Sequence, residues 1–142
     1  MSAAPSEPIR IAAAIICNGA GRVLVVRKRG ASAFMQPGGK IEPHESPPEA
    51  LARELKEEIA LTITPDVAVY IGRFSAETAN EQGRLVEADV FAVPLAGPVA
   101  AQAEIEEIRW ADPFALDLPL AILSRDHIMP VARARSRKEV KP

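Results

Sequence analysis

The feature that most constrains this chain is a helix whose start is marked unusually clearly. Ser46 is suited to cap a helix, Pro47 fits the first helical position, and Glu49 stands three residues after the cap. Together they form a capping box with proline at the start. These signals predict a helix from Pro47 to Ile59, with Leu51, Leu55 and Ile59 lining one apolar face at helical spacing.

A separate arc of this predicted helix is acidic. Glu54, Glu57 and Glu58 fall in one arc, and exposed like charges three or four residues apart cost a few tenths of a kcal/mol per pair, roughly. Arg53, four residues before Glu57, is spaced to relieve this repulsion. Such an arc is either a solvated surface or a site for a hard divalent cation such as Mg²⁺ or Mn²⁺. The helix taken alone fits both interpretations.

The residues around the helix extend the pattern. The stretch from Gly39 to Leu61 reads GKIEPHESPPEALARELKEEIAL and resembles the Nudix box, G-x5-E-x7-R-E-U-x-E-E-x-G-U, where U is a bulky aliphatic residue. The residues that match are Gly39, Glu45, Arg53, Glu54, Leu55, Glu57, Glu58 and Leu61. Ala60 replaces the last glycine, which costs alanine about 1 kcal/mol where the helix ends in a left-handed conformation.

The resemblance implies a site for Mg²⁺, which Mn²⁺ can replace. The metal ligands that it implies are Glu54, Glu57, Glu58, a backbone carbonyl of Gly38 or Gly39, and Glu104. Arg53 would orient the carboxylates, and Glu45 would pair with Arg53 or brace the loop. For the general base we favour Glu54, with Glu57 or Glu104 behind it. Glu106 and Glu107 are alternatives to Glu104, and a merely exposed position explains each of these three residues as well.

Substrate contacts are harder to predict from the residues. Arg27 and Arg29 stand at the end of a predicted strand, where they would either attract substrate phosphates or simply be solvated. Phe34 would stack on a base or belong to the core. We expect these three residues to contact the substrate.

The order of expected elements, strands around the acidic helix and a second helix near the end, suits an α+β chain. By resemblance this is the Nudix fold, an α/β/α sandwich with a mixed β-sheet. We expect a flexible leader at 1–8, a single domain at 9–134 and a basic flexible tail at 135–142. Within the domain, the strands expected at 9–17 and 22–29 would form a hairpin around the turn at 18–21.

Composition excludes several classes of function. A length of 142 residues suits one domain, and a net charge of −2 provides no general attraction for nucleic acid or an anionic membrane. The single cysteine, Cys17, excludes an internal disulfide and is expected to be a buried thiol. The apolar run at 11–17 is too short to span a membrane. We therefore expect a cytoplasmic protein, monomeric or homodimeric, with a small nucleotide as its partner and no stable nucleic-acid partner.

The implied activity is hydrolysis of a phosphoanhydride bond in a nucleoside diphosphate linked to another moiety. Neither proline nor tyrosine occurs between Phe74 and Glu81, where some subfamilies acting on ADP-ribose or dinucleoside polyphosphates carry a marker. This favours a MutT-like nucleoside triphosphate pyrophosphohydrolase. The alternatives are a pyrophosphatase for ADP-ribose, another nucleotide sugar or a dinucleotide, a non-catalytic nucleotide-binding Nudix module, and a structural domain with an acidic helix.

Overall fold

The computed structural model describes residues 7–78 and 84–139 of the chain. Its elements, in order, are β1 (Ile9–Ile15), β2 (Val23–Lys28), β3 (Gly38–Lys40), α1 (Pro47–Ile59), the short 3-10 helix η1 (Pro65–Val67), β4 (Val69–Glu77), β5 (Leu85–Ala92), β6 (Ile105–Ala111), the π-helix η2 (Leu123–Ile128) and α2 (Met129–Glu139). Among the described residues, no helix is both long and apolar enough to cross a membrane.

The main sheet has four strands in the order β3-β1-β5-β4. β1 pairs in parallel with β5 and antiparallel with β3, and β4 pairs antiparallel with β5, so the sheet is mixed as predicted. β1 lies inside the sheet, which agrees with its almost continuous apolar sequence. β2 and β6 form a separate antiparallel pair.

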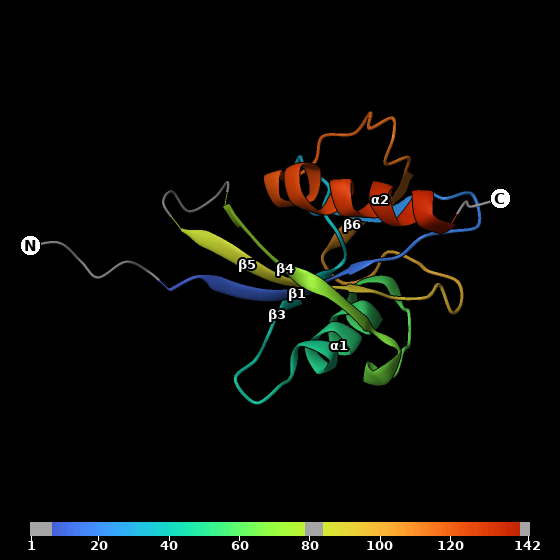
Figure 1. The fold of residues 1–142 in the computed structure, drawn as a ribbon. Helices are drawn as coiled ribbons and strands as arrows, with labels where there is room; N and C mark the ends of the chain where they lie inside the picture. Colours follow the sequence, from blue (N-terminus) through green and yellow to red (C-terminus); the bar gives the residue numbers. More distant parts are fainter. Residues whose placement is uncertain (1–6, 79–83, 140–142) are drawn as a thin grey trace, which may run out of the picture.

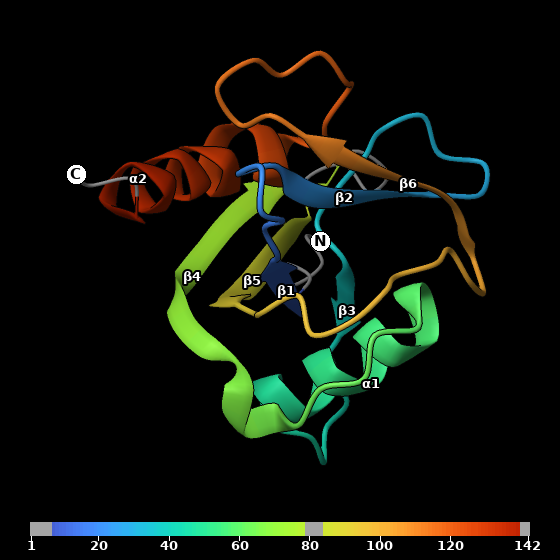
Figure 2. The same cartoon turned by 90° about the vertical axis from the view of Figure 1, so that its right-hand side faces the viewer.

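The two long helices lie on opposite sides of the strands, with α1 below and α2 above them in Figure 1. Figure 2 shows the same layers from the side, with β2 and β6 adjacent. This arrangement is the predicted α/β/α sandwich. Each layer has its own buried cluster, one under α1 and one under η2 and α2.

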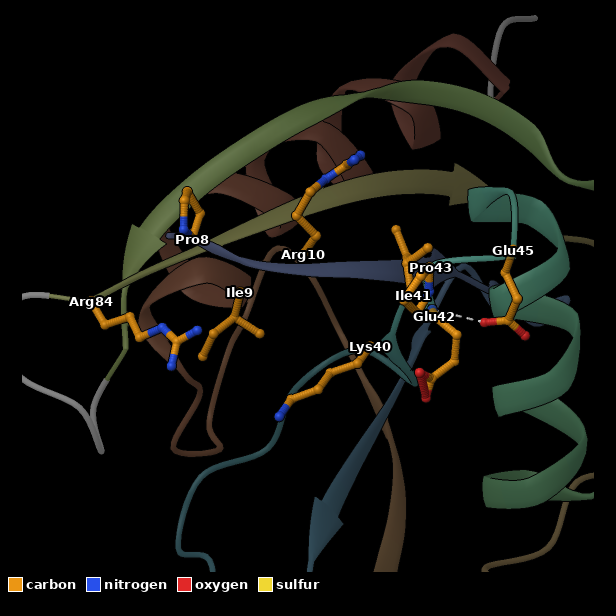
Figure 3. Close-up of a pocket in the computed structure, with 9 residues that line it drawn as sticks. All are labelled: Pro8, Ile9, Arg10, Lys40, Ile41, Glu42, Pro43, Glu45 and Arg84. Atoms are coloured by element: carbon orange, nitrogen blue, oxygen red, sulfur yellow. Dashed lines mark hydrogen bonds between the residues drawn. The ribbon is translucent and has the colours of Figure 1, made fainter. Parts of the chain in front are cut away.

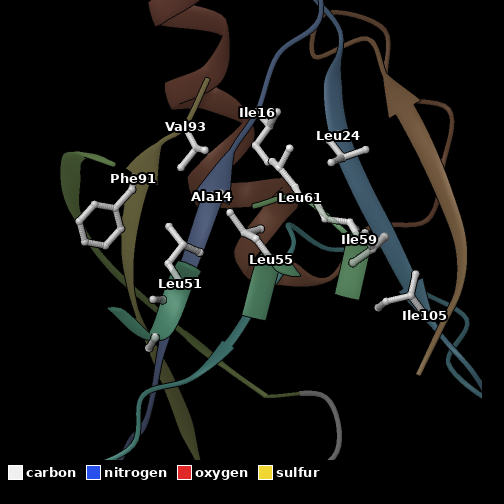
Figure 4. Packing of buried hydrophobic residues seen from close by; sticks show 13 residues of the cluster. Ala14, Ile16, Leu24, Leu51, Leu55, Ile59, Leu61, Phe91, Val93 and Ile105 are labelled. Carbon is white, nitrogen blue, oxygen red and sulfur yellow. The ribbon is translucent and has the colours of Figure 1, made fainter. Parts of the chain in front are cut away.

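The cluster under α1 fixes the direction in which the acidic arc faces (Figure 4). Leu51, Leu55 and Ile59 have no exposed surface and pack with Ala14 and Ile16 of the β1 segment. Fully burying a leucine or isoleucine side chain contributes about 1.5–3 kcal/mol. The three anchors therefore hold α1 in one rotational setting, with most of its charged residues turned away from this cluster.

Two predictions about the N-terminal third were wrong. β1 and β2 do not pair as a hairpin, because β2 pairs with β6. The two segments are joined only close to the turn, by the bridge of Cys17 to Val23 and by the N–H groups of Asn18 and Leu24, which donate to the carbonyls of Arg22 and Ile16. Cys17 is exposed rather than buried, since β1 ends at Ile15 and the chain has already begun to leave the sheet.

The structure describes most of the expected tail and little of the expected leader. α2 continues to Glu139, so its backbone includes five residues of the expected tail at 135–142, whereas residues 140–142 lie outside the described part. Of the expected leader at 1–8, the structure describes residues 7 and 8.

Candidate functional site

The start of α1 is organised as the sequence predicts. The hydroxyl of Ser46 accepts the backbone N–H of Glu49 at 3.3 Å, and the Glu49 carboxylate accepts the N–H of Ser46 at 2.8 Å. The helix then ends at Ala60, whose φ of 60° is left-handed, and whose N–H donates to the carbonyl of Leu55. The box therefore keeps the helix end that glycine normally provides, despite the alanine.

Arg53 is the centre of a network that ties α1 to the loop before it. Its guanidinium donates to both carboxylate oxygens of Glu45, at 2.7 and 2.9 Å, and to Glu54 at 2.7 Å. It also donates to the carbonyl oxygen of Lys40 at 3.0 Å. Glu45 in turn accepts the N–H of Glu42. The hydrogen bonds from Arg53 lower the pKa of Glu45 to about 2, and the same bonds raise the pKa of Arg53.

Gly38 and Gly39 allow strand β3 to approach both the helix and β1 closely. A Cβ on Gly39 would lie 2.4 Å from the carboxylate carbon of Glu54, so any side chain there would displace that carboxylate. A Cβ on Gly38 would lie 2.0 Å from the carbonyl oxygen of Ala12, and Gly38 has a φ of 148° that other residues rarely adopt. The two glycines thus place backbone next to the acidic arc.

Glu58 lies on the inner side of that arc and is buried, with 7% of its surface exposed. One of its oxygens accepts the N–H of Gly38 at 3.1 Å. Burial raises the pKa of Glu58 to about 7, although the Gly38 hydrogen bond and the charge of Lys28 act in the opposite direction. Glu57, by contrast, is largely exposed and lies 4.0 Å from Arg53.

The acidic residues fit a divalent metal ion in their chemistry. Carboxylate and backbone carbonyl oxygens are the ligands that Mg²⁺ prefers, and Gly39 leaves the space beside Glu54 free of a side chain. Within the described residues, no group of three or more His, Cys, Asp or Glu side chains is arranged to hold a metal ion. In this structure Glu54 accepts a hydrogen bond from Arg53, and Glu58 accepts the N–H of Gly38.

The three expected substrate contacts already have protein partners. Arg27 donates to Glu107 at 3.2–3.3 Å and to the carbonyl of Ala31, and its guanidinium lies 5.9 Å from the ring centre of Phe34. Phe34 is 4% exposed and belongs to the cluster under α2. Arg29 pairs with Glu106 at 3.3 Å. These contacts leave Arg29 exposed, Arg27 half-buried and Phe34 enclosed.

Glu104 stands just before β6 and is exposed, and its backbone carbonyl accepts the N–H of Arg29. Lys28 is not among the residues expected to contact the substrate, yet its charge acts on Glu58. A register shift between Arg27 and Lys28 interrupts the pairing of β2 with β6 at this point. The sequence offered a signal, the basic run RKR, but alternation alone does not show which of its members faces the glutamates.

A hollow of about 430 Å³ lies beside the Arg53 network, and Figure 3 shows its lining. The residues that line it are Pro8, Ile9, Arg10, Lys40, Ile41, Glu42, Pro43, Glu45 and Arg84. It meets the network through Glu45 and Lys40 and does not include the helical glutamates. Its size suits a small ligand, and three of its side chains are basic.

Comparison with known proteins adds independent evidence. A family model described as the NUDIX domain matches residues 7–131. The CTP pyrophosphohydrolase of Escherichia coli (strain K12) is 32% identical over 118 residues, which cover 80% of this chain and 83% of that protein. The crystal structure of a MutT protein from Methanosarcina mazei Go1 superposes with a TM-score of 0.71 and 26% identity, covering 96% of this chain and 99% of that one.

A second group of relatives matches over a shorter stretch. The RNA pyrophosphohydrolase of Halorhodospira halophila (strain DSM 244 / SL1) is 49% identical over 55 residues, or 39% of this chain. The chain spans between 27% and 34% of the length of four such RNA pyrophosphohydrolases.

Proposed function

This chain belongs to the Nudix family, and from that premise we propose that it is a metal-dependent pyrophosphohydrolase acting on nucleoside triphosphates. The observation that carries the proposal is the Arg53 network. Arg53 holds Glu45 and Glu54 with short, charge-assisted hydrogen bonds and anchors them to the carbonyl of Lys40, next to Gly39. A module that only binds nucleotides does not need a complete set of helical carboxylates held in this way.

The proposed metal ligands are Glu54, Glu57, Glu58, Glu104 and a backbone carbonyl of Gly38 or Gly39. A divalent ion bound there supplies positive charge beside the phosphates and lowers the pKa of the attacking water. Glu54 is the favoured general base, because Arg53 fixes the direction of its carboxylate. Glu57, which is 58% exposed, and Glu104 remain the alternatives for this role.

The triphosphate assignment is supported by a relative that matches along most of both chains and is named a CTP pyrophosphohydrolase. Water attacks one phosphorus of the anhydride, and the products are a nucleoside monophosphate and pyrophosphate. Lys28, whose charge acts on Glu58, and the exposed Arg29 are the cations that we propose for the phosphates.

The experiment that tests the proposal identifies the nucleotide products by chromatography after incubation with Mg²⁺, and it measures phosphate release with and without added inorganic pyrophosphatase. The panel contains CTP, the other nucleoside triphosphates, 8-oxo-dGTP, ADP-ribose, a dinucleoside tetraphosphate, a nucleotide sugar and a 5′-triphosphorylated RNA. We expect selective conversion of a triphosphate to its monophosphate, with phosphate release only when the pyrophosphatase is present. Selective turnover of ADP-ribose or the nucleotide sugar would replace the substrate, and no turnover of any compound would overturn the enzymatic assignment.

A further inference from the structure

Gln36 and Ser124 form a buried polar pair that the proposed chemistry does not use. Gln36 is 5% exposed and Ser124 is 2% exposed. The hydroxyl of Ser124 donates to the side-chain oxygen of Gln36 at 2.5 Å. This contact occupies one end of the Gln36 amide and thereby orients the other.

The nitrogen at the other end of the amide, Nε2, is buried and has no hydrogen-bond partner among the residues that the structure describes. A buried amide nitrogen carries two hydrogens, and leaving both unpaired is unfavourable, so most such groups in proteins have a partner. The partner is then either a trapped water molecule or a group that arrives with a ligand.

The position of Gln36 favours a ligand. Gln36 stands two residues before Gly38, whose N–H is bonded to Glu58. The segment that carries it lies between β2 and the approach to the second helix, because Met35 bridges to Val26 and Phe34 to Leu120. Gln36 therefore lies between Gly38 of the candidate active site and the chain segment that leads into the second helix.

Ser124 belongs to the π-helix η2, Leu123–Ile128. Widened helical turns of this kind are rare and occur frequently at functional sites. Phe34 and Leu123, which stand near the pair in the chain, belong with Leu120 to one buried apolar cluster. Because the pair is buried, water would compete little for a hydrogen bond made here. Such a bond would therefore discriminate strongly between a ligand that has an acceptor at this point and one that lacks it.

We propose that Gln36 is a specificity-determining residue, whose amide, held by Ser124, donates a hydrogen bond to an acceptor on the base of the nucleotide. The inference rests on the proposed function, because it assumes a nucleotide at the adjoining site. The matching group is a carbonyl oxygen or an unprotonated ring nitrogen at the edge of a planar base. Leu116 and Leu118, which stand in a segment without helix or strand, are half-buried against the cluster that contains Phe34 and Leu123.

The first arm of the test is kinetic. Gln36→Met keeps the length of the side chain and removes both polar atoms, and Gln102→Met makes the same change at an exposed position as a control. We expect Gln36→Met to lower kcat/KM for the best nucleoside triphosphate by about tenfold to a hundredfold and to reduce the differences between bases. Ser124→Ala, which frees the amide to rotate, should reduce these differences in the same direction. An equal loss for every base in Gln36→Met would overturn the inference.

The second arm does not depend on turnover. The side-chain amide signals of Gln36, assigned by their absence in Gln36→Met, are followed by NMR in the wild-type protein while each nucleoside monophosphate is added without metal. We expect them to shift with the preferred base. Signals that no nucleotide moves would overturn the inference. A base-dependent shift in a protein that hydrolyses nothing would support the inference while the proposed function fails.

Discussion

Two arginine–carboxylate networks in this molecule have similar hydrogen bonds but connect different parts of the fold. The first joins Arg53 to Glu45, eight positions earlier in the sequence, and to the adjacent Glu54. The second surrounds Asp89, which is 2% exposed and accepts from Arg10 and Arg73, both at 2.9 Å. Its members come from β1, β4 and β5 and are up to 79 positions apart.

The different positions of the two networks indicate which of them supports the proposed hydrolysis. The Arg53 network is adjacent to the glycines and glutamates of the candidate site, and it fixes carboxylates that are proposed to act. The Asp89 network lies across three paired strands and holds a buried charge that would otherwise be unfavourable. We therefore expect changes to the first network to affect turnover and changes to the second to affect stability.

Arg53→Ala gives the largest expected effect. It removes the group that orients Glu54 and anchors Glu45, so we expect kcat/KM for the preferred triphosphate to fall about a hundredfold, as is typical when the partner of a ligand is lost. Arg73→Ala is the matched control and should leave kcat/KM within about threefold, because its partner Asp89 keeps Arg10. Equal losses of turnover in the two variants would break the comparison.

Asp89→Asn should have the next largest effect, this time on stability. The substitution keeps the volume but removes the charge that Arg10 and Arg73 share. Both arginines are about half exposed, so water partly compensates, and we expect unfolding free energy to drop by about 2 kcal/mol. Denaturant unfolding measures this change. A variant that unfolds like the wild type, or one that loses turnover while staying equally stable, would contradict the division between the two networks.

Ala60→Gly should produce a smaller gain. Ala60 is exposed and adopts a left-handed conformation, which is costly for alanine and natural for glycine. We expect unfolding free energy to rise by about 1 kcal/mol, with unchanged kcat/KM, because no proposed ligand is altered. Thermal unfolding provides the measurement, and a lower melting temperature would show that the local helix end is not strained.

The effect of pH sharpens the comparison further. Because Arg53 lowers the pKa of Glu45 to about 2 in the folded protein, Glu45 stabilises the fold above its ordinary pKa of 4.5, and this contribution is lost as pH falls towards 2. The difference in melting temperature between wild type and Glu45→Gln should therefore be largest above pH 5 and shrink towards pH 2. A difference that stays constant over this range would mean that the ion pair contributes nothing to stability.

The same contrast explains what the sequence could predict. The bounds of α1 and its capping box follow from Ser46, Pro47 and Glu49, which act within one turn, and the resemblance to the Nudix box indicated the partnership of Arg53 with Glu45. The pairing of β2 with β6 joins residues about 80 positions apart, and no local pattern indicates it. The predicted hairpin failed for that reason.

Other features left weaker signals. Asp89 interrupts the apolar sequence of β5 on the same face as Phe91, which indicates a buried charge but not its partners. The orientation of Lys28 depends on an irregularity in the β2–β6 pairing, and the hydrogen bond between Gln36 and Ser124 depends on a π-helix. Irregularities of this kind result from tertiary packing, so periodicity does not predict them.

The central claim is that the carboxylates of α1 bind a divalent metal ion for hydrolysis, and the most direct measurement is a Mn²⁺ titration of the wild-type protein and of Glu57→Gln. Glu77→Gln, at the exposed end of β4, makes the same change of charge away from the site and serves as control. We predict that Glu57→Gln weakens Mn²⁺ binding at least tenfold and abolishes hydrolysis at saturating Mg²⁺, while its fold and the Glu77→Gln variant remain unaffected. Unchanged Mn²⁺ affinity and near-normal turnover in Glu57→Gln would contradict the account.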